Sequence, residues 1–233
     1  MRFIDRFEAI LLDMGNTFMF DCDRFSNLDN FAKTYSQLGG TQFNNVQVKA
    51  IVSGAIAQMG YDYENPEYYE CFPSIISYLY RILRQNDLPT TEIELLEKVI
   101  TIHEIGTIPD THAEAVRQLR ITHKLGVVSN IWCQSKFCLE EFHRVGINDI
   151  FTTNIFSSDY GIIKPSPLIF QKAIEEIGVH ESKIVFIGDS LKYDIAGAKA
   201  VNLATVWINS EQNELEQNTI SDLIIQDLKN LVQ

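Results

Sequence analysis

Polar residues that could handle phosphate follow several apolar runs of this sequence. Asp13 ends the first run, Ser129 and Asn130 follow the second, and Lys164 stands before a proline. Gly188-Asp189-Ser190 ends a later run. A carboxylate can attack phosphorus, a hydroxyl and a cation can hold phosphate oxygens, and a second carboxylate can hold a metal ion. These residue types suit phosphoryl transfer.

The runs that carry these residues have the character of buried β-strands. Each is short and apolar, as expected for strands covered on both faces of a parallel sheet. Five strands are predicted: Glu8–Asp13, Leu125–Ser129, Ile150–Ile155, Ile184–Ile187 and Ala204–Ile208.

Helical patterns separate the last four strands and have recognisable ends. Thr111 and Glu114 have the spacing of a capping box, and Ser166 before Pro167 predicts a helix start that Gly178 closes. Alternating strands and helices predict a doubly wound, Rossmann-like parallel sheet of the α/β class. Ligands of such sheets bind beyond the carboxyl ends of the strands, so the polar residues should converge there.

Between the first strand and the helix that precedes the second lie roughly ninety residues, too many for a simple crossover connection. Recurring apolar positions predict helices at Phe25–Leu38, Val46–Met59, Tyr68–Asn86 and Thr90–Glu104. We therefore expect a core domain of residues 1–19 and 105–233 with a helical cap domain of residues 20–104. Packing is the expected role of the cap's many tyrosines, Tyr61 and Tyr63 among them, and Glu92, Glu94 and Glu97 are expected on a solvated helix face.

Four motifs, in order along the chain, resemble those of the haloacid dehalogenase superfamily, in its form with a helical C1-type cap. They are Leu12-Asp13-Met14-Gly15-Asn16-Thr17, Val128-Ser129-Asn130, Ile163-Lys164-Pro165, and Ile187-Gly188-Asp189-Ser190 with Asp194 following. Each motif alone is weak. Together, at predicted strand ends, they identify the chain as a member of this superfamily.

The resemblance implies a phosphatase-like hydrolase in which Asp13 attacks phosphorus to form an aspartyl-phosphate that water cleaves. It implies Mg²⁺ held by Asp13, the Gly15 carbonyl and Asp189, with Asp194 in the surrounding shell. It also implies phosphate binding by Ser129, Asn130 and Lys164, with Lys164 neutralising the charge of the reacting groups. The expected substrate is a small phosphorylated metabolite.

Position 15 departs from the family pattern. Family phosphatases usually carry a second aspartate there, which protonates the leaving oxygen, whereas this chain has Gly15. Three outcomes stay open: a leaving group that needs little protonation, an acid borrowed from elsewhere with Asp21 and Asp23 as candidates, or a weak or inactive enzyme.

Three alternative functions also stay open. A 2-haloacid dehalogenase uses the same nucleophile without metal, but Gly188-Asp189 resembles the phosphatase form. Phosphonate cleavage needs a cap lysine as Schiff-base partner, for which Lys33 and Lys49 are the early candidates. An inactive relative could bind a metabolite or another protein.

The composition restricts the partners. The formal net charge of −12 repels nucleic acid and anionic membrane surfaces. Four cysteines without a CxxC pair, and no apolar signal segment, predict reduced thiols and a cytoplasmic protein. We expect neither nucleic acid nor membrane as a partner, while monomer and homodimer both stay open.

Overall fold

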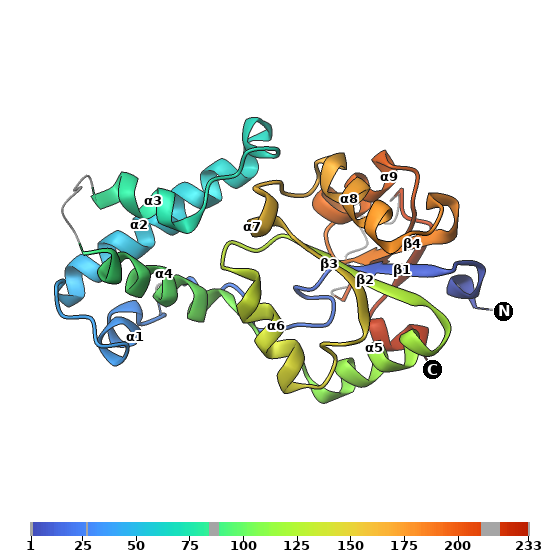
Figure 1. Cartoon of the computed structure of the whole chain (residues 1–233), viewed down its shortest axis with the longest axis horizontal. Helices are drawn as coiled ribbons and strands as arrows, with labels where there is room; N and C mark the ends of the chain where they lie inside the picture. The colour runs from blue at the N-terminus through green and yellow to red at the C-terminus, as the bar shows by residue number, and fades with distance from the viewer. Residues whose placement is uncertain (1, 27, 84–88, 211–219, 233) are drawn as a thin grey trace.

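The computed structural model describes residues 2–26, 28–83, 89–210 and 220–232 of the chain. These residues form a six-stranded, all-parallel sheet with the order β3-β2-β1-β4-β5-β6 (Figure 1). The strands are β1 Ala9–Leu12, β2 Lys124–Ser129, β3 Phe151–Phe156, β4 Ile184–Gly188, β5 Ala204–Ile208 and β6 Leu223–Ile225. The predicted Rossmann-like α/β class is confirmed.

The sixth strand corrects the prediction of five. β6 has three residues and pairs with β5 at the edge of the sheet. An apolar stretch this short carries no strand signal of its own. Only its pairing with Val206–Ile208 makes it a strand.

Helices cover both faces of the sheet. α5 Asp110–Thr122 and α6 Ser135–Arg144 lie on one side, and α8 Pro167–Ile177 and α9 Ala196–Ala200 on the other (Figure 1). Successive side chains of β1 alternate between the two cores: Ile10 and Leu12 pack with the first pair of helices, and Ala9 and Leu11 with the second. This double burial explains the continuous apolar runs.

The predicted helix ends are confirmed only in part. Ser166 caps α8 by accepting a bond from a backbone N–H, and Gly178 closes that helix with a φ of 65°. The predicted capping box of Thr111 and Glu114 is wrong. α5 begins at Asp110, directly after a proline, and has no side-chain cap.

The segment between β1 and α5 holds α1 Phe31–Gln37, α2 Asn45–Glu64, α3 Ile75–Leu83 and α4 Thr90–Glu104. These four helices pack on one another to one side of the sheet, at the left of Figure 1. We call residues 20–104 the cap segment, and its boundaries as a domain stay a proposal. The predicted end of the third helix at Asn86 lies outside the described residues.

The two connections between the cap segment and the core run side by side. Phe20 and Thr107 exchange two backbone hydrogen bonds of 2.8 Å, and Asp23 N donates to Glu104 O at 2.9 Å. A Cβ at Gly106 would lie 2.2 Å from Phe20 O, so the close approach of the two chains requires glycine there. No helix among the described residues is long and apolar enough to span a membrane.

Candidate active site

The carboxyl ends of β1, β2 and β4 are neighbours at one edge of the sheet. Strand order reverses between β1 and β4, which is the position where Rossmann-like sheets bind ligands. β1 leads into Asp13, β2 ends at Ser129, and β4 leads into Asp189. The topology therefore brings these predicted site residues together.

Asp13 is buried, with 5% exposure, and three side chains bind its carboxylate. Ser129 Oγ donates to Asp13 Oδ1 at 3.2 Å, and Lys164 Nζ donates to the same oxygen at 2.5 Å. Thr17 Oγ1 lies 3.4 Å from Oδ2. A carboxylate held from both sides keeps one orientation, as a nucleophile requires.

Lys164 joins two buried aspartates. Its ammonium group lies 2.5 Å from Asp13 and 2.6 Å from Asp194 Oδ1. Burial alone would lower the pKa of Lys164, but the negative charges of Asp13 and Asp194 raise it above its ordinary value. Lys164 therefore stays a cation within the site.

Gly188 makes room for Asp194. A Cβ at position 188 would lie 2.5 Å from Asp194 Cγ, so even alanine would displace the carboxylate that pairs with Lys164. The second oxygen of Asp194 accepts a hydrogen bond from Ser190 N at 2.9 Å. The Gly188-Asp189-Ser190 sequence thus supplies an acid and also positions Asp194.

The site fits the predicted Mg²⁺. Oxygens of Asp13, Asp189 and Asp194 lie within 4.8 Å of one another. Burial and the charge of Asp13 raise the pKa of Asp189 to about 7, a sign of crowded anions that a cation would relieve. The donors are hard oxygens, as magnesium prefers, and the Gly15 carbonyl accepts no hydrogen bond within the described residues. The ligand set stays a prediction.

Asn130 lies beside the site with its side chain already bonded. Oδ1 accepts from Lys164 N at 2.7 Å, and Nδ2 donates to Lys164 O at 3.2 Å and to the hydroxyl of Tyr63 at 2.7 Å. The carboxamide ties the loop after β2 to the segment before α8. The phosphate role of Asn130 stays a prediction; its side chain is engaged, whereas its backbone N–H has no acceptor within the described part of the chain.

Asp21 and Asp23, the hypothesised borrowed acids, lie on the connection that leaves β1 for the cap segment. Solvent reaches both side chains. The protein around Asp23 nevertheless desolvates its carboxyl, and together with the charge of Asp13 this raises the pKa of Asp23 to about 6. Asp23 thus interacts electrostatically with the predicted nucleophile.

The cap segment contacts the core on both sides of the site. Glu64, at the end of α2, accepts a hydrogen bond of 2.6 Å from the Tyr193 hydroxyl and pairs with Lys192. Phe72 N donates to Gly161 O at 2.8 Å. The residues from Glu64 to Phe72 therefore contact the segments that follow β4 and β3.

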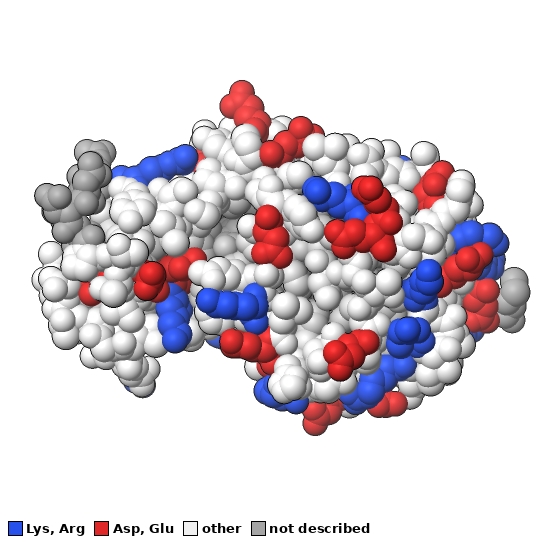
Figure 2. All heavy atoms as spheres, viewed as in Figure 1, with Lys and Arg blue, Asp and Glu red and all other residues white. Residues whose placement is uncertain are grey.

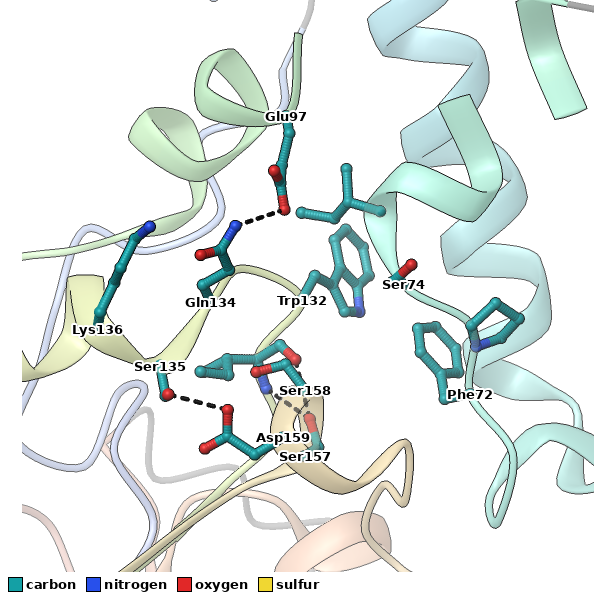
Figure 3. A pocket seen from close by; sticks show the side chains of 13 residues that line it. Phe72, Ser74, Glu97, Trp132, Gln134, Ser135, Lys136, Ser157, Ser158 and Asp159 are labelled. Atoms are coloured by element: carbon teal, nitrogen blue, oxygen red, sulfur yellow. Dashed lines mark hydrogen bonds between the residues drawn. The ribbon is translucent and has the colours of Figure 1, made fainter. Parts of the chain in front are cut away.

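A pocket of about 370 Å³ opens between the cap segment and the core (Figure 3). Its walls include the rings of Phe72 and Trp132 and two hydrogen-bonded pairs, Gln134 with Glu97 at 3.1 Å and Ser135 with Asp159 at 2.9 Å. Ile131, which also lines it, lies two residues after Ser129, so its Cα is within roughly 8 Å of the Ser129 Cα. The pocket thus reaches the loop after β2, but Asp13, Lys164 and Asp189 are not among the residues that line it.

The molecular surface shows no continuous basic area on the face drawn in Figure 2. Lysine and arginine side chains are interspersed there with aspartate and glutamate. Lys33 and Lys49, the candidate Schiff-base lysines, are exposed on α1 and α2. Within the described residues, neither has a hydrogen bond or ion pair to the aspartates of the site.

Parallel strand order, the helical insertion after β1 and a buried lysine between aspartates together define a Rossmann-like hydrolase of the α/β class. The chain belongs to the haloacid dehalogenase-like hydrolase family, whose model matches residues 40–208.

Among curated relatives, the chain is 33% identical to a glyceraldehyde 3-phosphate phosphatase of Pyrococcus furiosus over 97 residues, 40% of each protein. It is 31% identical to the pyrimidine 5′-nucleotidase YjjG of Escherichia coli over 91 residues, 39% of this chain and 40% of that protein. The aligned parts thus span less than half of each relative.

Solved structures resemble nearly the whole chain. A phosphatase of the same family from Thermococcus onnurineus has a TM-score of 0.63 and 25% identity, covering 96% of this chain and 95% of its own. A 2-haloacid dehalogenase from Pseudomonas syringae has a TM-score of 0.65 at 20% identity, covering 97% and 96%, which shows the shared fold.

Sequence reasoning missed several residues around the site. Tyr63 was expected only to pack, yet its hydroxyl bonds to Asn130. A signal was present, because Tyr63 lies four residues after the buried Met59 on the same helix face, whereas Tyr61 does not. Glu92 and Glu97 correct the predicted solvated face, since Glu92 is 6% exposed and Glu97 lines the pocket.

Proposed function

We propose that the protein is a Mg²⁺-dependent phosphate-monoester hydrolase that acts on a small phosphorylated metabolite. The observation that carries this proposal is the Lys164 ammonium between Asp13 and Asp194, with Asp189 beside them at the switch point of the sheet. The phosphatase names of the relatives support the same reaction.

Asp13 is the proposed nucleophile. Its carboxylate attacks phosphorus, the bond to the ester oxygen breaks, and water later hydrolyses the aspartyl-phosphate. Ser129 binds a phosphate oxygen, and Lys164 offsets negative charge on Asp13 and on the transferring group. Bound Mg²⁺, held by Asp13, Asp189 and the Gly15 carbonyl, supplies further positive charge at the phosphate.

Position 15 provides no acid for the leaving oxygen. Of the two borrowed acids, Asp23 is the better supported, because its raised pKa of about 6 keeps part of it protonated near neutral pH. Its interaction with Asp13 supports the same assignment.

A second candidate function is metabolite binding by an inactive relative of these enzymes. Gly15 favours it, because the usual acid is missing at this position. Dehalogenation is less well supported. That reaction needs no metal, yet Asp189 places a second anion beside Asp13, as a metal site would require.

We also propose a cytoplasmic location, in keeping with unpaired thiols at Cys22, Cys71, Cys133 and Cys138.

The test is release of inorganic phosphate from 4-nitrophenyl phosphate, an aryl ester, and from glycerol 3-phosphate, an alkyl ester. We expect turnover with Mg²⁺, its loss in EDTA, and its loss in Asp13→Asn. Absence of turnover of a broad panel of phosphate esters with Mg²⁺ would favour the binding protein instead.

A further inference from the structure

Tyr63 lies between Asn130, beside the aspartate site, and two aromatic rings that line the pocket. It stands near the end of α2, and its ring packs against Tyr193 of the core with centroids 4.8 Å apart. It also meets two rings that line the pocket, Phe72 at 6.1 Å and Trp132 at 6.3 Å. Figure 3 shows these two rings at the pocket wall.

The hydrogen-bond directions around Asn130 fix the role of the Tyr63 hydroxyl. Lys164 N can only donate, so the Asn130 oxygen must face it, and the bond measures 2.7 Å. The Asn130 amide nitrogen therefore faces Tyr63 and donates to its oxygen at 2.7 Å. The phenolic hydrogen is left over, and no group in the described ranges accepts it.

An available donor at this position has an evident use. Asn130 directly follows Ser129, which bonds to Asp13, so the phenol lies on the cap side of the catalytic groups. Burial raises the pKa of Tyr63 above its ordinary value, so the hydroxyl keeps its hydrogen throughout the working pH range. In the proposed reaction the phosphate is bound at Asp13 and the alcohol extends toward the cap segment, so the ester oxygen lies between them.

We propose that the Tyr63 hydroxyl donates a hydrogen bond to the ester oxygen of the substrate, the oxygen that leaves with the alcohol. This inference rests on the proposed phosphatase function and adds a catalytic group from the cap segment. As the bond from phosphorus to this oxygen breaks, its electron pair stays on the oxygen, and the hydrogen bond stabilises that growing charge. The proton that the alcohol finally carries comes from Asp23 or from water, so the phenol ends the step unchanged.

The proposal predicts a loss that depends on the leaving group. An alkyl alcohol is a poor leaving group and accumulates much negative charge, whereas 4-nitrophenolate stabilises that charge itself. We expect Tyr63→Phe to lower kcat/KM for glycerol 3-phosphate about 100-fold. The same variant should change kcat/KM for 4-nitrophenyl phosphate little.

Tyr61→Phe is the matched control, because Tyr61 lies on the same helix, two residues away, with 72% exposure. It should leave both substrates unaffected. Thermal melting of Tyr63→Phe, expected near that of the wild type, checks that the cap segment remains folded.

Equal losses for the two esters would overturn the proposal, because a purely structural tyrosine would affect both alike. Tyr63→Phe rates equal to those of Tyr61→Phe would overturn it as well. In both cases wild-type turnover would leave the proposed function standing. Failure of the wild type to hydrolyse any ester of a broad panel with Mg²⁺ would overturn both proposals together.

Discussion

Lys164 and Asp194 form an ion pair of 2.6 Å in which the side chains are 3% and 0% exposed. Asp194 lies in the short π-helix Leu191–Ile195 after β4, and Lys164 lies before α8, so the pair links two segments that the fold brings to the same edge of the sheet. It holds the ammonium group at Asp13 and compensates one of the buried negative charges there.

Asp194→Asn should therefore impair catalysis although the nucleophile Asp13 is unchanged. Asparagine keeps the shape but removes one of the charges that hold Lys164, and loss of such a supporting partner typically costs about 10- to 100-fold. We expect that decrease in kcat/KM. Asp5→Asn, which breaks an exposed pair with Arg2, is the control and should keep full activity. If Asp194→Asn kept the kcat/KM of the wild type, Asp194 would not be needed to position Lys164.

Mg²⁺ should stabilise the folded protein. Ligand at about 100 times its dissociation constant adds about 2.7 kcal/mol, and about 1 kcal/mol raises Tm by about 2 to 4 °C for a chain of this size. Thermal melting with increasing MgCl₂ should show a rise of several degrees. Asp189→Asn should remove most of this rise in Tm. The control is Asp222→Asn, which removes an acid that pairs with Lys199 and should retain the rise. A rise of the same size in Asp189→Asn would exclude Asp189 as a ligand.

The buried carboxyl of Glu104 should make the stability of the folded protein depend on pH. This carboxyl accepts bonds from Trp132 N at 2.5 Å and Cys133 N at 2.8 Å, yet desolvation dominates and raises its pKa from 4.5 to about 8. Between these pH values the folded state binds more protons than the unfolded state, so stability falls as pH rises, by up to about 1.4 kcal/mol per pH unit.

Urea unfolding from pH 5 to pH 8 measures this slope. Glu104→Gln, which cannot ionise, should show a flatter dependence than the wild type. Glu94→Gln, on the exposed face of the same helix, should keep the wild-type slope. Identical slopes in Glu104→Gln and wild type would mean that Glu104 is ionised in the folded protein.

Gly15→Asp should add the missing acid. A Cβ at position 15 meets nothing within 4 Å, so the first atom of a side chain has space there. We expect higher activity toward glycerol 3-phosphate. The gain should reach about 10²-fold, the lower end of what a positioned general acid typically contributes. Gly15→Asn has nearly the same shape without an acid and should give no gain. Equal rates for the two variants would show that protonation of the leaving group does not limit the reaction.

The pH profile tests Asp23. An acid must be protonated to act, so with a pKa of about 6 for Asp23, kcat/KM for the alkyl ester should fall as pH rises above that value. Asp23→Asn should lower the rate and remove this decline, whereas Asp21→Asn should preserve it. An unchanged profile in Asp23→Asn would refute the borrowed-acid hypothesis.

The sequence alone determined the α/β class and the residues that meet at the sheet edge. Burial on both faces demands apolar runs, which are visible locally, and parallel strands place their carboxyl ends at one edge. Asp13, Ser129 and Asp189 could therefore be placed before any coordinates, and their roles stay predictions. The short β6 gave no comparable signal, since its strand character comes from pairing with β5.

Only the tertiary structure decided which cap residues face the core. Tyr61 and Tyr63 are chemically the same and two positions apart, yet one is exposed and the other bonds to Asn130, 67 residues away along the chain. Glu104 likewise binds the loop after β2 through contacts 28 and 29 residues away along the chain. The periodicity of apolar residues indicates which face of a helix is buried. It does not indicate which element covers that face, because this depends on how separate elements pack.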